Sequence, residues 1–194
     1  MPGSDFWGMV AGIIALAAFV PYVITTLYGS TKPNRATWFI WAIAGFMLAV
    51  SYYSSVADHT FWVPISYFLG PLVIALFSLR YGEGGWDRFD RTCLVVTSAS
   101  ALLWWVFSSP FVALLINLGI EMTGTLPTFR KTYREPASEN VLSWSMFLVA
   151  NTINLYIAET WTSKPAIYPI VVFLGSASMV TFILWRRYRH KVMQ

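Results

Sequence analysis

Long stretches of this 194-residue chain contain no charged side chain. A membrane-spanning helix needs about 20 consecutive, mostly apolar residues. The interval 92–129 is about twice that length, contains Glu121 as its single charge, and has a turn signal at residues 108–110. We therefore read this interval as two helices. The remaining uncharged intervals lie between Asp5 and Lys32, between Arg35 and Asp58, between His59 and Arg80, and over residues 140–158 and 165–185. Each is long enough for one helix. With the two helices of 92–129 they give seven predicted spans.

The composition agrees with a membrane protein. Charged residues make up 11% of the chain and hydrophobic residues 57%, whereas about a quarter of the residues are charged in an ordinary soluble domain. A disordered chain and a nucleic-acid-binding protein are therefore excluded, and an all-α polytopic membrane protein is the expected fold class. The single cysteine, Cys93, cannot form an internal disulfide, and two histidines leave little for a metal site. We expect no cofactor and no bound metal.

The basic residues fall almost entirely on one side of the predicted membrane. If the seven spans alternate in direction, twelve of the thirteen Lys and Arg residues share a side, and Lys164 lies on the other. Short cytoplasmic loops carry such an excess, so we expect an external N-terminus and a cytoplasmic C-terminus. The first residues lack the basic segment of a signal peptide, and we expect the first helix to be retained. The expected location is the plasma (inner) membrane of a bacterium.

The chain contains ten tryptophans. Tryptophan is enriched where a helix meets the membrane–water interface. The following residues near the ends of predicted helices are therefore expected to form an interfacial belt: Trp7, Trp38, Trp41, Trp62, Trp86, Trp144, Trp161 and Trp185.

The chain contains an internal repeat. Residues 64–70 and 169–175 share five of seven positions. At nearly the same offset, a proline is followed seventeen residues later by a tryptophan, first in Pro21 and Trp38 and again in Pro127 and Trp144. Two matches in the same order indicate two three-helix repeats. Since one further helix separates them, the repeats run parallel. The expected organisation is a first repeat, a linker helix, and a second repeat with a basic tail: residues 1–81, 82–109 and 110–194.

In each repeat, a proline near the end of the first helix is followed by a short basic loop, then by a polar residue and a tryptophan that open the next helix. This arrangement resembles the PQ-loop pattern of the superfamily that contains SWEET and SemiSWEET sugar transporters, lysosomal amino-acid exporters and KDEL receptors. Tyr22 and Thr128 stand where that pattern has glutamine. The resemblance implies a three-plus-one-plus-three fold that works by alternating access, with Pro21 and Pro127 as hinges.

Glu121 is the one acidic residue expected near the middle of a span, where a charge costs at least about 2 to 3 kcal/mol. It should face the interior of the bundle or a watery cavity. Asn117 lies four residues earlier on the same helix face, and Asn151 and Asn154 share a face of the next helix. With Tyr67 of the third helix, these residues form the predicted substrate site, and Glu121 is the predicted proton-coupling residue. Hydrogen bonds that hold the helices together are the alternative role of these polar groups.

An enzyme is not expected. Intramembrane aspartyl proteolysis needs two facing acids, and only Glu121 lies within a predicted span. Metal-dependent proteolysis needs a cluster of ligands, but His59 and His190 are predicted on opposite sides of the membrane. A retinal protein needs a lysine in the last span for the Schiff base, and this span has none. Two function classes remain. The first is a transporter of a small polar solute, with protons as a candidate second partner. The second is a KDEL-receptor-like protein that binds a ligand or peptide without moving it. The substrate and the oligomeric state are left open.

Overall fold

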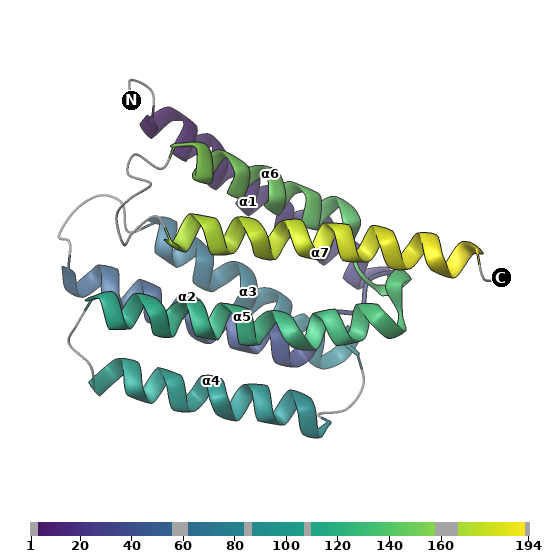
Figure 1. Ribbon diagram of the computed structural model, residues 1–194, viewed down its shortest axis with the longest axis horizontal. Coiled ribbons are helices and arrows are strands. Elements are labelled where there is room, and N and C mark those ends of the chain that lie inside the picture. The colour runs from purple at the N-terminus through teal and green to yellow at the C-terminus, as the bar shows by residue number, and fades with distance from the viewer. Residues whose placement is uncertain (1–3, 56–61, 84–86, 107–109, 158–166, 193–194) are drawn as a thin grey trace. The chain divides into compact units, whose positions relative to one another are not determined.

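The computed structural model describes residues 4–55, 62–83, 87–106, 110–157 and 167–192. Within these segments the regular structure is entirely helical (Figure 1). The seven α-helices are α1 (Ser4–Leu27), α2 (Arg35–Ser55), α3 (Trp62–Tyr81), α4 (Arg88–Val106), α5 (Pro110–Arg134), α6 (Val141–Ile157) and α7 (Ile167–Val192). The prediction of an all-α chain with seven helices is confirmed.

The helices lie where the spans are predicted, but three of them extend several residues beyond the uncharged intervals. α4 begins at Arg88, before residue 92, and α5 continues to Arg134, beyond residue 129. α4 ends at Val106 and α5 begins at Pro110, as the predicted break requires, although residues 107–109 lie outside the described segments. Proline fits at the start of a helix because a backbone N–H in the first turn has no intrahelical acceptor, so no hydrogen bond is lost. α7 continues to Val192, about two turns beyond the predicted end of its span at Trp185. The basic tail is therefore helical.

Asparagine side chains begin α2 and α6. Asn34 Oδ1 accepts a hydrogen bond from the Thr37 N–H at 3.1 Å, and Asn140 Oδ1 accepts one from the Ser143 N–H at 2.8 Å. Each bond satisfies a backbone donor that the first turn of a helix leaves unpaired. These N-caps occupy equivalent positions in the predicted repeat, so both repeats open their second helix in the same way.

The chain folds as two compact units. The first unit consists of Met1–Thr31 with Thr132–Gln194, and the second of Lys32–Lys131. In the first unit α1 packs against α6, α6 against α7, and α7 against a short 3-10 helix, η1 (Pro136–Ser138); α1 and α6 run side by side in Figure 1. In the second unit α2 packs against α3 and α4. A buried apolar cluster joins α2, α4 and α5 there: Ile40, Ala44, Met47, Cys93 and Ile120.

The two units combine helices from both predicted repeats. The first unit contains the first helix of one repeat with the second and third helices of the other, and the second unit contains the remaining helices together with α4. The repeats are defined by sequence and the units by packing, so their boundaries differ. The division into residues 1–81, 82–109 and 110–194 stays a prediction.

Equivalent helix pairs in the two units meet at equivalent residues. In α2, a Cβ atom added at Gly45 would lie 2.3 Å from the carbonyl oxygen of Tyr67 in α3. In α6, Asn151 aligns with Gly45, and its Nδ2 donates to the carbonyl oxygen of Val172 in α7 at 3.3 Å. Val172 aligns with Tyr67 in the predicted repeat. Gly45 lets the backbones of α2 and α3 come close together, whereas Asn151 connects α6 to α7 through a side-chain hydrogen bond.

Gly45→Ala should destabilise the protein because the added methyl group would overlap the backbone of α3. Overpacking of this kind costs about 1–3 kcal/mol. Gly119→Ala is the matched control in the same unit, since a Cβ atom there has nothing within 4 Å, and it should leave stability unchanged or slightly higher. Thermal unfolding of the purified proteins in detergent, followed by circular dichroism, measures both. Equal melting temperatures for the two variants would contradict the close contact of α2 and α3.

Candidate functional site

Asn117 and Glu121 lie one turn apart on α5, in the second unit. Both are half-buried. Neither side chain forms a hydrogen bond or an ion pair with any residue that the structure describes. Buried polar groups are normally paired within the protein, with ordered water or with a ligand. This amide and carboxylate are therefore available to bind water or a solute.

The backbone beside Glu121 is held by α2. Trp41 Nε1 donates to the carbonyl oxygen of Glu121 at 3.4 Å. Gly124, one turn further along α5, leaves room for this approach, because a Cβ atom there would lie 2.8 Å from Ile40 Cγ2 and 2.9 Å from Trp41 Nε1. The Trp41 indole thus packs directly on α5 and fixes the turn that carries Glu121, while the Glu121 carboxylate has no partner among the described residues.

The other three predicted site residues lie on two helices. Tyr67 is half-buried on α3 of the second unit. Asn151 and Asn154 lie on α6 of the first unit, and Asn151 Nδ2 is bonded to α7 through Val172 O and also through Ser176 Oγ, each at 3.3 Å. Asn151 therefore has an interhelical role. Asn154 is half-buried, and its side chain has no partner among the described residues. The convergence of α5 and α6 on one substrate stays a prediction.

The repeated prolines lie within helices. Pro21 is inside α1 and Pro127 inside α5, and both helices continue beyond them. A proline within a helix removes one backbone hydrogen bond and favours a bend. Thr25 Oγ1 donates to the carbonyl oxygen of Pro21 at 2.7 Å, which adds a local bond at this turn. A hinge motion at either proline stays a prediction.

Glu139, which the sequence patterns do not single out, is the centre of a buried polar cluster in the first unit. It is 1% exposed, and its Oε2 accepts hydrogen bonds from Tyr22 Oη at 3.0 Å and from Trp144 Nε1 at 2.8 Å. Asn140 Nδ2 adds a bond to Thr25 Oγ1 at 2.9 Å. These bonds tie α1 to the start of α6. The position of Glu139 directly before the helix cap is the signal that could have indicated it.

The second unit has a corresponding anchor. Thr128 follows Pro127 as Tyr22 follows Pro21, and its Oγ1 donates to Thr37 Oγ1 at 2.8 Å, with both threonines fully buried. In both units, the residue after the repeated proline bonds to the residues that begin a second helix.

Two tryptophans predicted for the interfacial belt are buried, and the prediction is wrong for them. Trp144 donates its indole N–H to Glu139. Trp38 packs edge-on against Trp41, with 5.1 Å between ring centroids. At these helix starts the rings have polar and aromatic partners inside the protein, and these hold them away from an interface. Trp7 and Trp185 are exposed, as a belt requires.

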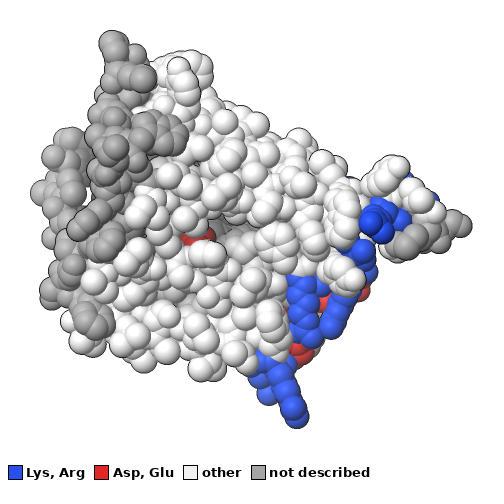
Figure 2. All heavy atoms as spheres, viewed as in Figure 1, with Lys and Arg blue, Asp and Glu red and all other residues white. Residues whose placement is uncertain are grey.

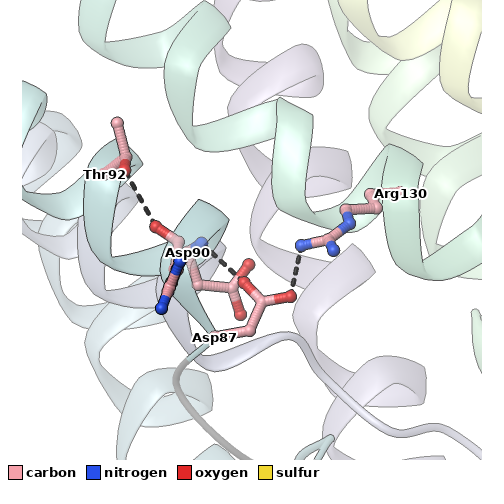
Figure 3. Close-up of polar contacts among 5 residues, drawn as sticks. Asp87, Asp90, Thr92 and Arg130 are labelled. Atoms are coloured by element: carbon pink, nitrogen blue, oxygen red, sulfur yellow. Dashed lines mark hydrogen bonds and ion pairs between the residues drawn. The ribbon is translucent and has the colours of Figure 1, made fainter.

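An ion pair joins α4 and α5 in the second unit (Figure 3). Asp87 Oδ1 accepts a hydrogen bond from the Asp90 N–H at 2.9 Å and so caps α4, while Asp87 Oδ2 pairs with the Arg130 guanidinium. The Arg130 Cζ also lies 5.0 Å from the centroid of the Phe89 ring. The Asp90 N–H and then the Arg130 charge hold the pKa of Asp87 below its usual value. One aspartate therefore starts α4 and connects it to α5.

No family model, curated protein or solved structure matches this chain. The resemblance to the PQ-loop superfamily consequently stays a prediction from the motifs. The residues that the structure describes include no group of three or more His, Cys, Asp and Glu side chains suited to a metal ion. The unpaired polar groups of α5 are the feature from which a function can be argued.

Glu139→Ala should lower stability because the buried Tyr22 Oη and Trp144 Nε1 would lose their acceptor. An unpaired buried donor costs about 1–3 kcal/mol. Tyr22→Phe removes one of the two donors, and the double variant completes a cycle that isolates the Tyr22–Glu139 bond. Unfolding free energies of the four proteins should give a coupling of about 1 kcal/mol. Strictly additive losses would contradict a direct bond.

Asp87 should contribute stability that depends on pH. Its folded pKa lies below the usual 3.8, so its contribution is present above that value and is lost as the pH falls through the lower folded value. Asp87→Asn keeps a capping side chain but removes the charge. The wild type should be more stable above about pH 5, by less than about 1 kcal/mol because the pair is partly exposed, and this difference should shrink below about pH 4. Melting temperatures from pH 3 to 7 test it, and a constant difference would contradict it.

Proposed function

We propose that this chain is an integral membrane protein that moves a small polar solute across the plasma membrane by alternating access, with Asn117 and Glu121 in its substrate site. The polar face of α5 carries this proposal. Two hydrogen-bonding side chains lie there without a partner among the described residues. One of them, Glu121, is the single charge in the interval 92–129.

The length and the apolar surface of the helices support the membrane location. Phe6–Leu27 and Ile167–Val192 are long and apolar enough to span a bilayer, yet only 28% and 22% of an apolar 18-residue stretch within each is buried. The core helix of a soluble protein would be mostly buried. On the face drawn in Figure 2, large areas carry no charged side chain apart from one visible acidic group. An extensive uncharged surface that is also apolar marks a contact with lipid or a partner. On α1, large apolar side chains are exposed three or four residues apart along the helix: Phe6, Met9, Ile13, Leu16, Val20, Ile24 and Leu27.

The distribution of basic residues supports seven crossings with an external N-terminus. In the second unit, Arg35 Nε donates to Ser78 O at 2.9 Å, which brings the start of α2 to the end of α3. Lys131 Nζ donates to the carbonyl oxygen of Lys32, and Arg130 pairs with Asp87 before α4. One end of this unit therefore holds all of its basic residues, as a cytoplasmic end should: Lys32, Arg35, Arg80, Arg88, Arg91, Arg130 and Lys131. Lys164 lies outside the described residues.

The chemistry of the α5 face supports a polar or amine-bearing solute. A carboxylate within a span, with no cationic partner among the described residues, can bind a proton or the positively charged part of a solute. The Asn117 amide adds two donors and an acceptor. Hinges at Pro21 and Pro127 would let the helices bend while Tyr22 and Thr128 keep each bent helix attached within its own unit.

A ligand screen followed by flux measurements tests the proposal. Amino acids, amines and sugars are screened for thermal stabilisation of the purified wild type and of Glu121→Gln, since a bound ligand raises the melting temperature. Compounds that stabilise only the wild type are then tested for uptake into proteoliposomes. Uptake supports transport, whereas binding without uptake would support the receptor class. Equal stabilisation of both proteins by every ligand would contradict a site at Glu121.

Glu121→Gln should abolish the pH dependence of solute binding and flux because an amide cannot take up and release a proton at this position. Glu135→Gln makes the same change at an exposed carboxylate outside the α-helices and should behave like the wild type. Uptake is measured across pH, with and without a proton gradient. An unchanged pH profile in Glu121→Gln would remove the proton-coupling role.

A further inference from the structure

The last turns of α7 bind the protein's own backbone through one face. Arg187 Nε donates to Pro136 O at 3.0 Å, and Arg187 Nη2 donates to Glu139 O at 2.6 Å. Arg186 donates to Tyr133 O, and its Cζ lies 4.1 Å from the centroid of the Tyr133 ring. Arg186 therefore holds the end of α5, and Arg187 holds the loop between α5 and α6. Both side chains are directed toward backbone carbonyl groups of the protein.

The opposite face of the same turns is exposed. Trp185, Tyr188 and Arg189 are spaced three and four residues along the helix and share one side. Trp185 is 46% and Tyr188 70% exposed, and the Arg189 Cζ lies 5.5 Å from a Trp185 ring centroid. Lys191 is also exposed, but it lies two residues beyond Arg189 and therefore on another side of the helix. α7 contains no acidic residue. We call Trp185, Tyr188 and Arg189 the α7 aromatic–basic face.

The position of this face along α7 specifies what it can contact. The face begins at Trp185, the last residue of the uncharged interval 165–185. An exposed tryptophan at the end of such an interval is typical of the membrane–water interface. Lys191 follows Trp185 by about 9 Å of helix. In the proposed orientation, Arg189 and Lys191 therefore lie near the phosphates of the cytoplasmic leaflet, where basic side chains attract anionic lipids.

We propose that the α7 aromatic–basic face binds the headgroup of an anionic phospholipid in the cytoplasmic leaflet. Arg189 pairs with its phosphate, and the Trp185 and Tyr188 rings lie against the adjoining interfacial region. Lys191, on another side of the helix, adds to the positive potential near the headgroups. Arg186 and Arg187 are excluded from this site because they are bonded to the protein. The inference rests on the membrane location within the proposed function, and it is independent of solute transport.

Lipid selectivity in nanodiscs tests this site. The full-length protein is placed in phosphatidylcholine nanodiscs that contain phosphatidylglycerol as a minor component, with either lipid spin-labelled. Electron paramagnetic resonance then measures the fraction of each labelled lipid that the protein immobilises. The wild type should prefer phosphatidylglycerol, and Arg189→Gln/Lys191→Gln should reduce this preference at least about threefold. Added salt should also weaken the preference, because it screens charges at the surface.

Two control variants separate a specific site from general attraction. Arg88→Gln/Arg91→Gln removes two exposed basic residues from the start of α4 and should keep the preference. Arg186→Gln/Arg187→Gln should lower the melting temperature and keep the preference. A wild type without preference, or an equal loss in the α4 variant, would overturn the site. Protein that does not stay with the nanodisc would overturn the membrane location and this site together, whereas an absence of flux would count against transport alone.

Discussion

In the proposed membrane location, the cost of placing a charge or an unpaired polar group in hydrocarbon accounts for the layout of this chain. Charged residues gather at helix ends, and α1 turns a continuous apolar stripe outward. A polar side chain inside such a helix therefore requires an explanation. For Asn151, the explanation is its hydrogen bonds to α7. Asn117 and Glu121 have none among the described residues, and a solute site is the explanation that uses both of them.

The two units anchor equivalent helix turns with different chemistry. After the first repeated proline, Tyr22 bonds to the buried Glu139 carboxylate, which also accepts from Trp144. After the second, Thr128 bonds to another hydroxyl group. Hydrogen bonds to a carboxylate are roughly twice as strong as those between neutral groups. The two repeats thus place an anchoring hydrogen bond at the same position but form it with different chemical groups. Glu121 is a further difference, because the first repeat has no acidic residue at the equivalent position.

Features that depend on local spacing could be predicted from the sequence. Seven helices, the break before Pro110 and the two asparagine caps all follow from residues that lie within a few turns of each other. The position of Glu139 before the helix cap could have drawn attention to the residue, but its bonding partner could not be predicted in this way, because Tyr22 lies 117 residues away. The burial of Trp144 follows from the same long-range cluster. A tryptophan near a helix end suits both an interface and a buried acceptor, and sequence alone does not distinguish these environments.

The central claim is that the helices cross a bilayer with their basic ends in the cytoplasm. Cysteine labelling tests it by measuring from which side of the membrane each loop is accessible. Cys93 is buried and can be replaced by alanine to give a background without cysteine. Ser30→Cys then reports on the loop between α1 and α2, and His59→Cys on the connection between α2 and α3. A membrane-impermeant maleimide added to intact cells should label His59→Cys and leave Ser30→Cys unlabelled, with the reverse result in inside-out vesicles. Labelling of both positions from the same side would contradict the account.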